Sequence, residues 1–135
     1  MQQVHKFKTM EPTNLANQEQ QSICTKYDAD FLPAPPNLKA GISLNVQEGL
    51  MPLNGIRYQP EEGTSGWFIW AGEEFSEATD FFVSMHIEHL KEFCPLVIKY
   101  LGLSPGWRFL VDGSGYEDVW RDEPPALDHI LKLPQ

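Results

Sequence analysis

An alternation of side chains between residues 40 and 46 constrains the fold of this chain more than any other feature. Ala40, Ile42, Leu44 and Val46 are apolar, and the residues between them are small or polar. Successive side chains of a β-strand point to opposite faces, so this spacing predicts a strand with one buried face. We expect other strands of the chain to pair with it.

Four more segments have the composition of strands. Each is short and contains aromatic or β-branched residues, and segments with turn-forming Gly or Pro separate them. They are residues 56–59, 67–71, 107–111 and 116–120. We expect the first three strands of the chain to pair in a meander. The last two flank the two-glycine turn Asp112-Gly113-Ser114-Gly115, which is typical of a hairpin.

Helices are expected in three places. Residues 13–27 form the first helix, with Thr13 as its N-cap. Between 81 and 93 apolar residues recur at three-to-four spacing, which predicts a second helix, and a third, short helix follows Pro95. The segment 31–38 holds three prolines and is expected to be an extended connector.

The order of these elements favours an α+β fold with one core. We expect a small antiparallel sheet of about five strands, with helices packed on one face. A chain of 135 residues is the size of a single domain. We therefore expect a flexible N-terminus over 1–12 and one α+β domain over 13–135.

The net charge of −9 is unevenly distributed. Residues 61–90 contain seven acids and no Lys or Arg, and residues 112–123 contain five acids and only Arg121. Such a surface repels nucleic acid and anionic lipid, and it attracts a basic protein. Solubility alone also explains acidic surfaces, and the charge does not separate these two interpretations.

The compartment follows from what the sequence lacks. No apolar run is long enough to span a bilayer, and the N-terminal segment lacks the apolar core of a signal peptide. Cys24 and Cys94 are far apart in the sequence, in neither a disulfide framework nor a metal-ligand spacing. We expect a cytoplasmic protein with reduced thiols.

A search for catalytic motifs finds no P-loop, no GxSxG and no HExxH. His86 and His89 share a helix face if this segment is helical, but they lack a third convergent ligand. Glu73 and Glu74 are adjacent, and adjacent residues of a strand point to opposite faces. Cys94 precedes a proline in an apolar context and is expected to be an inert buried thiol. We expect no enzyme activity, no metal and no cofactor.

The four tryptophans are candidates for either the core or an interface. Trp67 and Trp70 are three apart on one predicted strand, so they face opposite sides and at most one is expected in the core. Trp107 and Trp120 lie near the ends of the predicted hairpin, at positions that allow them to face each other across it. An exposed Trp among acids would be an aromatic anchor of the type that interfaces use.

Three motifs resemble a known family. They are SGWFIWAGEE (65–74), CPLVIKYLGLSPGWRFLVDG (94–113) and YEDVW (116–120). In order and spacing they resemble the immunity-protein domain family, which is encoded beside bacterial polymorphic toxins, over about residues 56–127. The resemblance implies a cytoplasmic protein that binds and neutralises a cognate toxin, and it supplies no catalytic residues. The stretch FSEATDFF departs from the more Asp-rich segment of many members, so the toxin can differ.

The charge and the resemblance lead to one site hypothesis. Many toxin domains are nucleases with basic clefts, and an acidic patch that fills such a cleft excludes the anionic substrate. The predicted patch consists of Glu61, Glu62, Glu73, Glu74, Glu77, Glu117 and Asp118, with Trp70 or Trp120 as the apolar anchor. The partner would be a cognate toxin protein, with neither nucleic acid nor membrane bound.

Three alternatives remain open at this point. The tryptophans could line a groove for a sugar, peptide or metabolite. A small metal-dependent enzyme would use His86, His89 and nearby carboxylates. An accessory scaffold protein would use the same acidic surface, and only the identity of its partner would distinguish it from an immunity protein.

Overall fold

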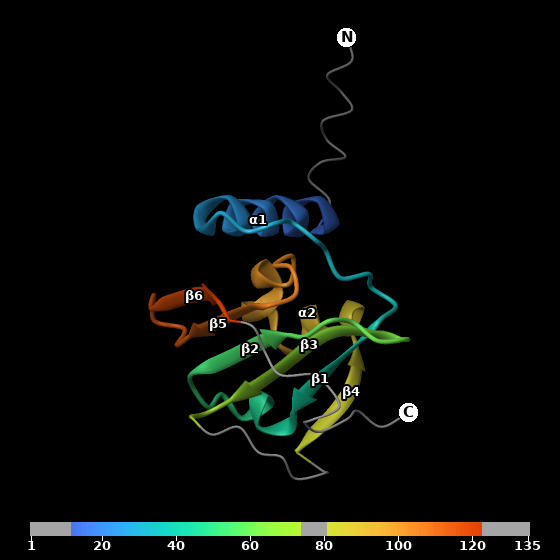
Figure 1. Ribbon diagram of the computed structural model, residues 1–135. Helices are drawn as coiled ribbons and strands as arrows, with labels where there is room; N and C mark the ends of the chain where they lie inside the picture. The colour runs from blue at the N-terminus through green and yellow to red at the C-terminus, as the bar shows by residue number, and fades with distance from the viewer. Residues whose placement is uncertain (1–11, 74–80, 123–135) are drawn as a thin grey trace.

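The computed structural model describes residues 12–73 and 81–122. Within these ranges, six strands form one open sheet in the order β4-β1-β3-β2-β5-β6 (Figure 1). The strands are β1 (Lys39–Ser43), β2 (Leu53–Arg57), β3 (Thr64–Ala71), β4 (Phe82–His86), β5 (Trp107–Val111) and β6 (Glu117–Arg121). All neighbouring pairs are antiparallel except β1 and β3, which run parallel.

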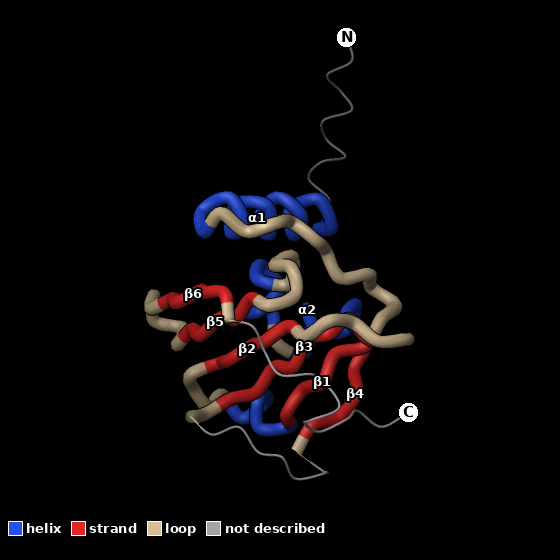
Figure 2. Tube along the Cα trace, viewed as in Figure 1, coloured by secondary structure: helices blue, strands red, loops and turns tan. Residues whose placement is uncertain are grey.

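Helical segments complete the α+β fold. They are α1 (Pro12–Tyr27), η2 (Leu44–Glu48), η3 (Ile87–His89), α2 (Leu90–Phe93) and η4 (Pro95–Tyr100), of which the three η segments are 3-10 helices. Figure 2 shows η4 between the long α1 helix and the sheet. The predicted α+β class, a small sheet with helices, is confirmed. None of the helices in the described ranges is long and apolar enough to cross a membrane.

The main core lies between the sheet and the helices. Trp67 and Phe109 from the sheet are at most 1% exposed, and their ring centroids lie 5.7 Å apart. Tyr100 of η4 stacks on Phe109 at 4.7 Å. Gly55 of β2 lies beneath the same ring, because a Cβ there would come within 2.1 Å of Phe109 Cε2. Because Gly55 has no side chain, the Phe109 ring lies directly on β2.

A second apolar cluster lies on the opposite face of the sheet. It consists of Ile56, Tyr58, Phe68, Trp70 and Phe82, all at most 5% exposed. Phe68 makes edge-to-face contacts with Tyr58 at 5.5 Å and with Phe82 at 5.1 Å. Trp67 and Trp70 do face opposite sides, but both are buried. The expectation that at most one of them is in the core was wrong, because both faces of β3 are apolar.

The predicted meander is wrong. β1 and β2 do not pair with each other, because both pair with β3, with Ile42 and Gly55 each opposite Ile69. The chain crosses the end of β3 between them through η2. Asn45 fixes this crossing by donating a 3.1 Å hydrogen bond from Nδ2 to the Ala71 carbonyl. Because β2 runs opposite to both β1 and β3, β1 and β3 are parallel.

The strand predicted over 40–46 ends early, at Ser43. Leu44 begins η2 and is 56% exposed, whereas Val46 remains buried. The Ser43 hydroxyl donates a hydrogen bond to the Asn45 side-chain oxygen, and such local bonds compete with strand pairing. The apolar alternation therefore continues into a helical turn and leaves Leu44 on the surface.

The helix predicted over 81–93 is wrong in its first half. Residues 82–86 form β4, which pairs with β1 and places Val83 opposite Ile42 and Met85 opposite Ala40. Only Leu90–Phe93 is α-helical. Pairing with the open edge of β1 outweighs the three-to-four spacing of the apolar side chains, because tertiary context overrides local propensity.

The remaining local predictions are close to the structure. The first helix spans Pro12–Tyr27, one residue earlier than predicted, so Thr13 lies inside the helix and is not its N-cap. A short 3-10 helix begins at Pro95, and the final hairpin is β5 and β6.

Trp107 and Trp120 do not face each other. Their opposite residues are Arg121 and Arg108, so the two tryptophans lie on opposite faces of the sheet.

Candidate functional site

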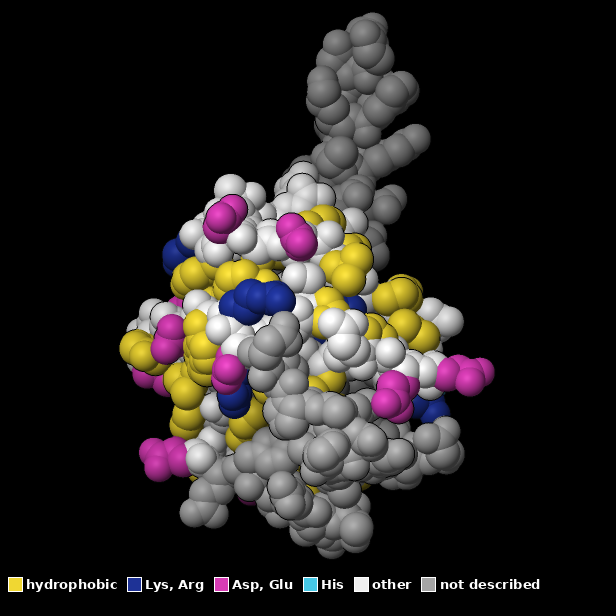
Figure 3. Space-filling model, in the orientation of Figure 1, with side chains coloured by type: hydrophobic (Ala, Val, Ile, Leu, Met, Phe, Trp, Pro, Cys, Tyr) yellow, Lys and Arg dark blue, Asp and Glu magenta, His cyan; other side chains and the backbone are white. Residues whose placement is uncertain are grey.

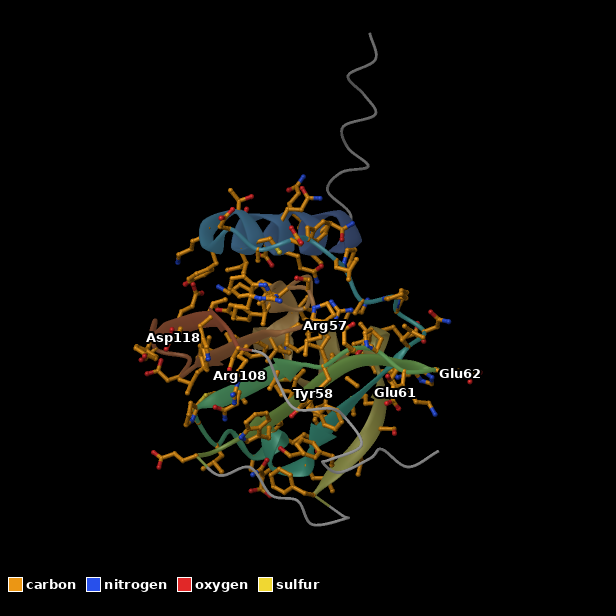
Figure 4. All side chains as sticks on the ribbon, viewed as in Figure 1. Arg57, Tyr58, Glu61, Glu62, Arg108 and Asp118 are labelled. Atoms are coloured by element: carbon orange, nitrogen blue, oxygen red, sulfur yellow. The ribbon has the colours of Figure 1, made fainter. Side chains whose placement is uncertain are left out.

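The predicted acidic residues are divided between the two ends of the sheet. β1, β3 and β5 finish, and β2, β4 and β6 begin, at one end, which we call the η2 end because η2 lies there. Glu73 follows β3 at this end. Glu61 and Glu62 occupy the β2–β3 turn at the other end, and Figure 4 shows them far from Asp118 of β6. Glu74 and Glu77 lie outside the described residues.

Figure 3 gives the same view of the charges. On the face shown, acidic side chains occur in separate places, with hydrophobic and basic side chains between them. Glu61, Glu62, Glu73 and Asp118 are all exposed. Among the predicted acids in the described ranges, Glu61 and Glu62 thus lie at one end of the sheet, and Glu73 and Asp118 lie at the other.

Glu117 is held by the fold. Its carboxylate accepts hydrogen bonds from the hydroxyls of Tyr27 at 2.5 Å and Tyr100 at 2.6 Å, and from Lys26 Nζ at 2.9 Å. Its side chain is 16% exposed. Burial alone would raise the pKa of Glu117, but the three donors lower it to about 2. Burial and the Glu117 contact also raise the pKa of Tyr100.

The predicted aromatic anchors differ in their environment. Trp70 is 5% exposed and lies edge-on to Phe82, with 6.4 Å between ring centroids. Trp120 is half-buried, and the guanidinium of Arg108 lies over its ring at 5.4 Å. Arg108 also donates a 3.0 Å hydrogen bond from Nη1 to Asp122. The Trp120 ring therefore already has a cation over it, and its surroundings are less acidic than the sequence implies.

An exposed apolar surface at the η2 end was missed by sequence reasoning. The exposed large hydrophobic side chains there are Leu44 (56%), Leu50 (46%), Met51 (39%) and Tyr116 (55%). A Cβ at Gly72 would lie 3.1 Å from Leu50, and one at Gly113 would lie 3.5 Å from Met51. The loop before β2 is thus packed against the β5–β6 turn and the end of β3.

The sequence did contain a signal for this surface. Leu50 and Met51 stand together in a segment expected to be a turn, and Tyr116 follows a two-glycine turn. Turns are usually polar and lie on the surface, so large apolar residues in them are candidates for contact with a partner.

The histidines and cysteines singled out in the sequence as candidates for chemistry lie within the described residues. His86 and His89 have ring centroids 5.9 Å apart. Among residues 12–73 and 81–122, no three His, Cys, Asp or Glu side chains are placed to hold a metal ion. Cys24 and Cys94 are free and buried, and burial raises the pKa of both thiols, so neither is an activated nucleophile.

Comparison with known proteins places the chain in a family. The Imm33-like domain family matches residues 19–122, which is well over half of the chain. The match begins within α1, so the expectation that the similarity starts near residue 56 was too narrow. No curated protein and no solved structure is significantly similar to the chain. The resemblance to an immunity-protein family is confirmed, and the chain belongs to the Imm33-like domain family.

Proposed function

We propose that this protein is a cytoplasmic immunity protein that binds and neutralises a cognate bacterial toxin. The observation that carries the proposal is the match of the Imm33-like domain family over residues 19–122. Immunity-type families act typically by binding, without catalysis. The protein would therefore protect its cell by occupying the toxin. The buried thiols of Cys24 and Cys94, and the absence of a metal-binding cluster among the described residues, are consistent with this.

The charge of the chain supports a basic toxin as partner. A net charge of −9 accelerates encounter with a basic surface and disfavours nucleic acid as a ligand. A nuclease domain has such a surface, because it must bind a polyanion. We propose that the toxin is of this kind and that the bound protein excludes its substrate.

The ligand-binding alternative loses its main support. It requires tryptophans that line an open groove, and Trp67 and Trp70 are 0% and 5% exposed. Trp107 and Trp120 lie on opposite faces of the sheet and do not share a groove. No observation favours this alternative over the immunity proposal.

A co-expression experiment tests the proposal. The neighbouring genes are searched for a toxin-like domain, and that domain is induced in host cells, either alone or together with this protein. We expect death with the toxin alone and survival when both are present. A catalytically inactive toxin domain and an unrelated immunity protein are the controls. Equal death with and without this protein would contradict the proposal for that toxin.

A further inference from the structure

The η2 end of the sheet combines exposed apolar side chains with a local excess of acids. Four of the six large hydrophobic side chains that are exposed in the described ranges lie there: Leu44, Leu50, Met51 and Tyr116. Interfaces are enriched in Tyr and Met, and their centres are apolar with a polar rim. The η2 end has this composition, whereas the Glu61–Glu62 turn has only the charges.

The rim at this end is acidic. The acids of this end are Glu48, Glu73, Asp112, Glu117 and Asp118, and Lys26 of α1 reaches it through its ion pair with Glu117. Of these acids, Glu48, Glu73 and Asp118 are exposed, whereas Glu117 is paired with Lys26. An apolar centre inside such a rim is complementary to an apolar recess surrounded by Lys and Arg.

The apolar side chains project from a backbone that is already fixed. Asp112 Oδ1 accepts hydrogen bonds from the Ser114 and Tyr116 amides, at 2.9 and 3.2 Å, which hold the β5–β6 turn. On the other side, the Gly72 amide donates to the Pro52 carbonyl at 2.8 Å, and Asn54 donates to the Gly72 carbonyl at 2.8 Å. A surface fixed before binding loses little conformational entropy when a partner docks.

We propose that the η2 end is the docking surface for a basic protein, with Met51 and Tyr116 as its central anchors and Glu48, Glu73 and Asp118 as its rim. The proposal rests on the immunity function and specifies which surface performs it. It replaces the buried Trp70 with exposed anchors. It also divides the predicted acids, since Glu73 and Asp118 belong to the surface and Glu61 and Glu62 do not.

Site-specific photo-crosslinking in the producing cells tests this placement. p-Benzoylphenylalanine replaces Met51 or Tyr116 at the η2 end, and Leu15 or Leu32 as matched controls. The controls are exposed to a similar extent, 46% and 48%, but lie on α1 and on the connector after it. Mass spectrometry identifies each crosslinked protein, and the purified captured domain is then titrated with wild-type protein.

The possible results of the crosslinking test the docking surface and the immunity function separately. We expect Met51 and Tyr116 to crosslink one basic toxin polypeptide and the controls to crosslink none. A basic partner that is not a toxin, captured only at the η2 end, would support the surface and contradict the immunity function. A toxin captured only from Leu15 or Leu32 would support the function and overturn the surface. No crosslink at any position would overturn the surface.

A double substitution provides the quantitative test. Met51→Ala with Tyr116→Ala should weaken binding of the captured domain at least tenfold, since buried anchors carry most of the energy of an interface. Both side chains are exposed in the free protein, so the circular dichroism spectrum should not change. The control is Leu15→Ala with Leu32→Ala, which should leave affinity within twofold of wild type. Equal affinity of the two double variants would overturn the surface.

Discussion

The hydroxyl of Tyr100 on η4 donates a 2.6 Å hydrogen bond to Oε1 of Glu117 on β6. Tyr27, at the end of α1, donates to the other oxygen of the same carboxylate. One acid therefore joins the edge of the sheet to both helices that cover it. Glu117 was predicted to contact a partner, but its carboxylate already has three donors within the chain.

Replacing Glu117 should destabilise the protein. Glu117→Gln removes the charge from three hydrogen bonds, and bonds to charged groups contribute about 1.5–3 kcal/mol each at most. We expect a loss of about 2 kcal/mol in the free energy of unfolding, measured by urea denaturation at neutral pH. Asp118→Asn, at the neighbouring exposed position, is the control and should change stability by less than about 0.5 kcal/mol. Equal losses of stability in the two variants would show that Glu117 does not join β6 to α1 and η4.

The lowered pKa of Glu117 should make the stability of the protein depend on pH. The pKa of Glu117 is lowered from 4.5 to about 2 on folding. A lowered pKa of an acid stabilises the folded state above its unfolded pKa, and this stabilisation is lost as the pH falls toward the folded pKa. The gap in stability between wild type and Glu117→Gln should therefore narrow between pH 4.5 and about 2. A gap that stays constant over this range would argue against the lowered pKa.

Arg57 is a second buried side chain that joins separate segments of the chain by hydrogen bonds. It is 2% exposed, and it donates to the carbonyls of Ser65 at 2.9 Å, Leu32 at 2.6 Å and Leu103 at 2.8 Å. Burial lowers its pKa to about 10, so it remains charged at neutral pH.

The single amine of a lysine cannot replace this geometry. Arg57→Lys should lower the free energy of unfolding by about 2–4 kcal/mol, because buried carbonyls lose their donors. Thermal and urea denaturation measure the loss. Lys91→Ala, at an exposed position on α2, is the control. Near-wild-type stability of Arg57→Lys would mean that the three carbonyls do not need this side chain.

Gly55 should tolerate no side chain. A Cβ there would lie 2.1 Å from Cε2 of the buried Phe109 ring. Overpacking of a core costs typically about 1–3 kcal/mol. Gly55→Ala should therefore lower the urea midpoint clearly and disturb the packing of the aromatic rings.

Gly63→Ala is the comparison for Gly55→Ala. No atom lies close to the position of its Cβ, and only the positive φ of Gly63 opposes the change. The left-handed conformation costs an L-residue free energy without touching the core. The near-ultraviolet circular dichroism spectrum should therefore change in the Gly55 variant alone. The same spectral change in both variants would contradict the close contact between Gly55 and Phe109.

Charge reversal should distinguish the two ends of the sheet. Glu73→Lys with Asp118→Lys should slow association with the toxin about tenfold and weaken its salt dependence, because rim charges act mainly on the rate of encounter. Glu61→Lys with Glu62→Lys changes the net charge by the same amount at the other end and should have a smaller effect. Stopped-flow kinetics at several ionic strengths measure both. The larger effect at Glu61 and Glu62 would place the interface there.

The elements that sequence reasoning located well depend on neighbours in the chain. The final hairpin follows from a two-glycine turn between two strand-like segments, and α1 follows from its helical composition. β4 was missed because its conformation depends on pairing with β1, which lies far earlier in the chain. No local pattern contains that information.

The site was harder to predict for a related reason. Successive residues of a strand point to opposite faces, so Glu117 and Asp118 lie on opposite faces of β6. Only the register of the sheet shows which of these faces the helices cover. Glu117 turns toward the tyrosines and Asp118 toward solvent. The exposed anchors were missed because Met51 and Tyr116 come to the same end of the sheet only when β2 pairs with β5.

A calorimetric titration of the purified protein with the purified domain of the partner that it captures in the producing cells tests the proposed function most directly. Toxin activity is assayed in the same samples. We expect a 1:1 complex with a dissociation constant of about 1 μM or tighter, and loss of toxin activity in the same molar ratio. No binding heat, with full toxin activity at roughly a tenfold molar excess of this protein, would contradict the account.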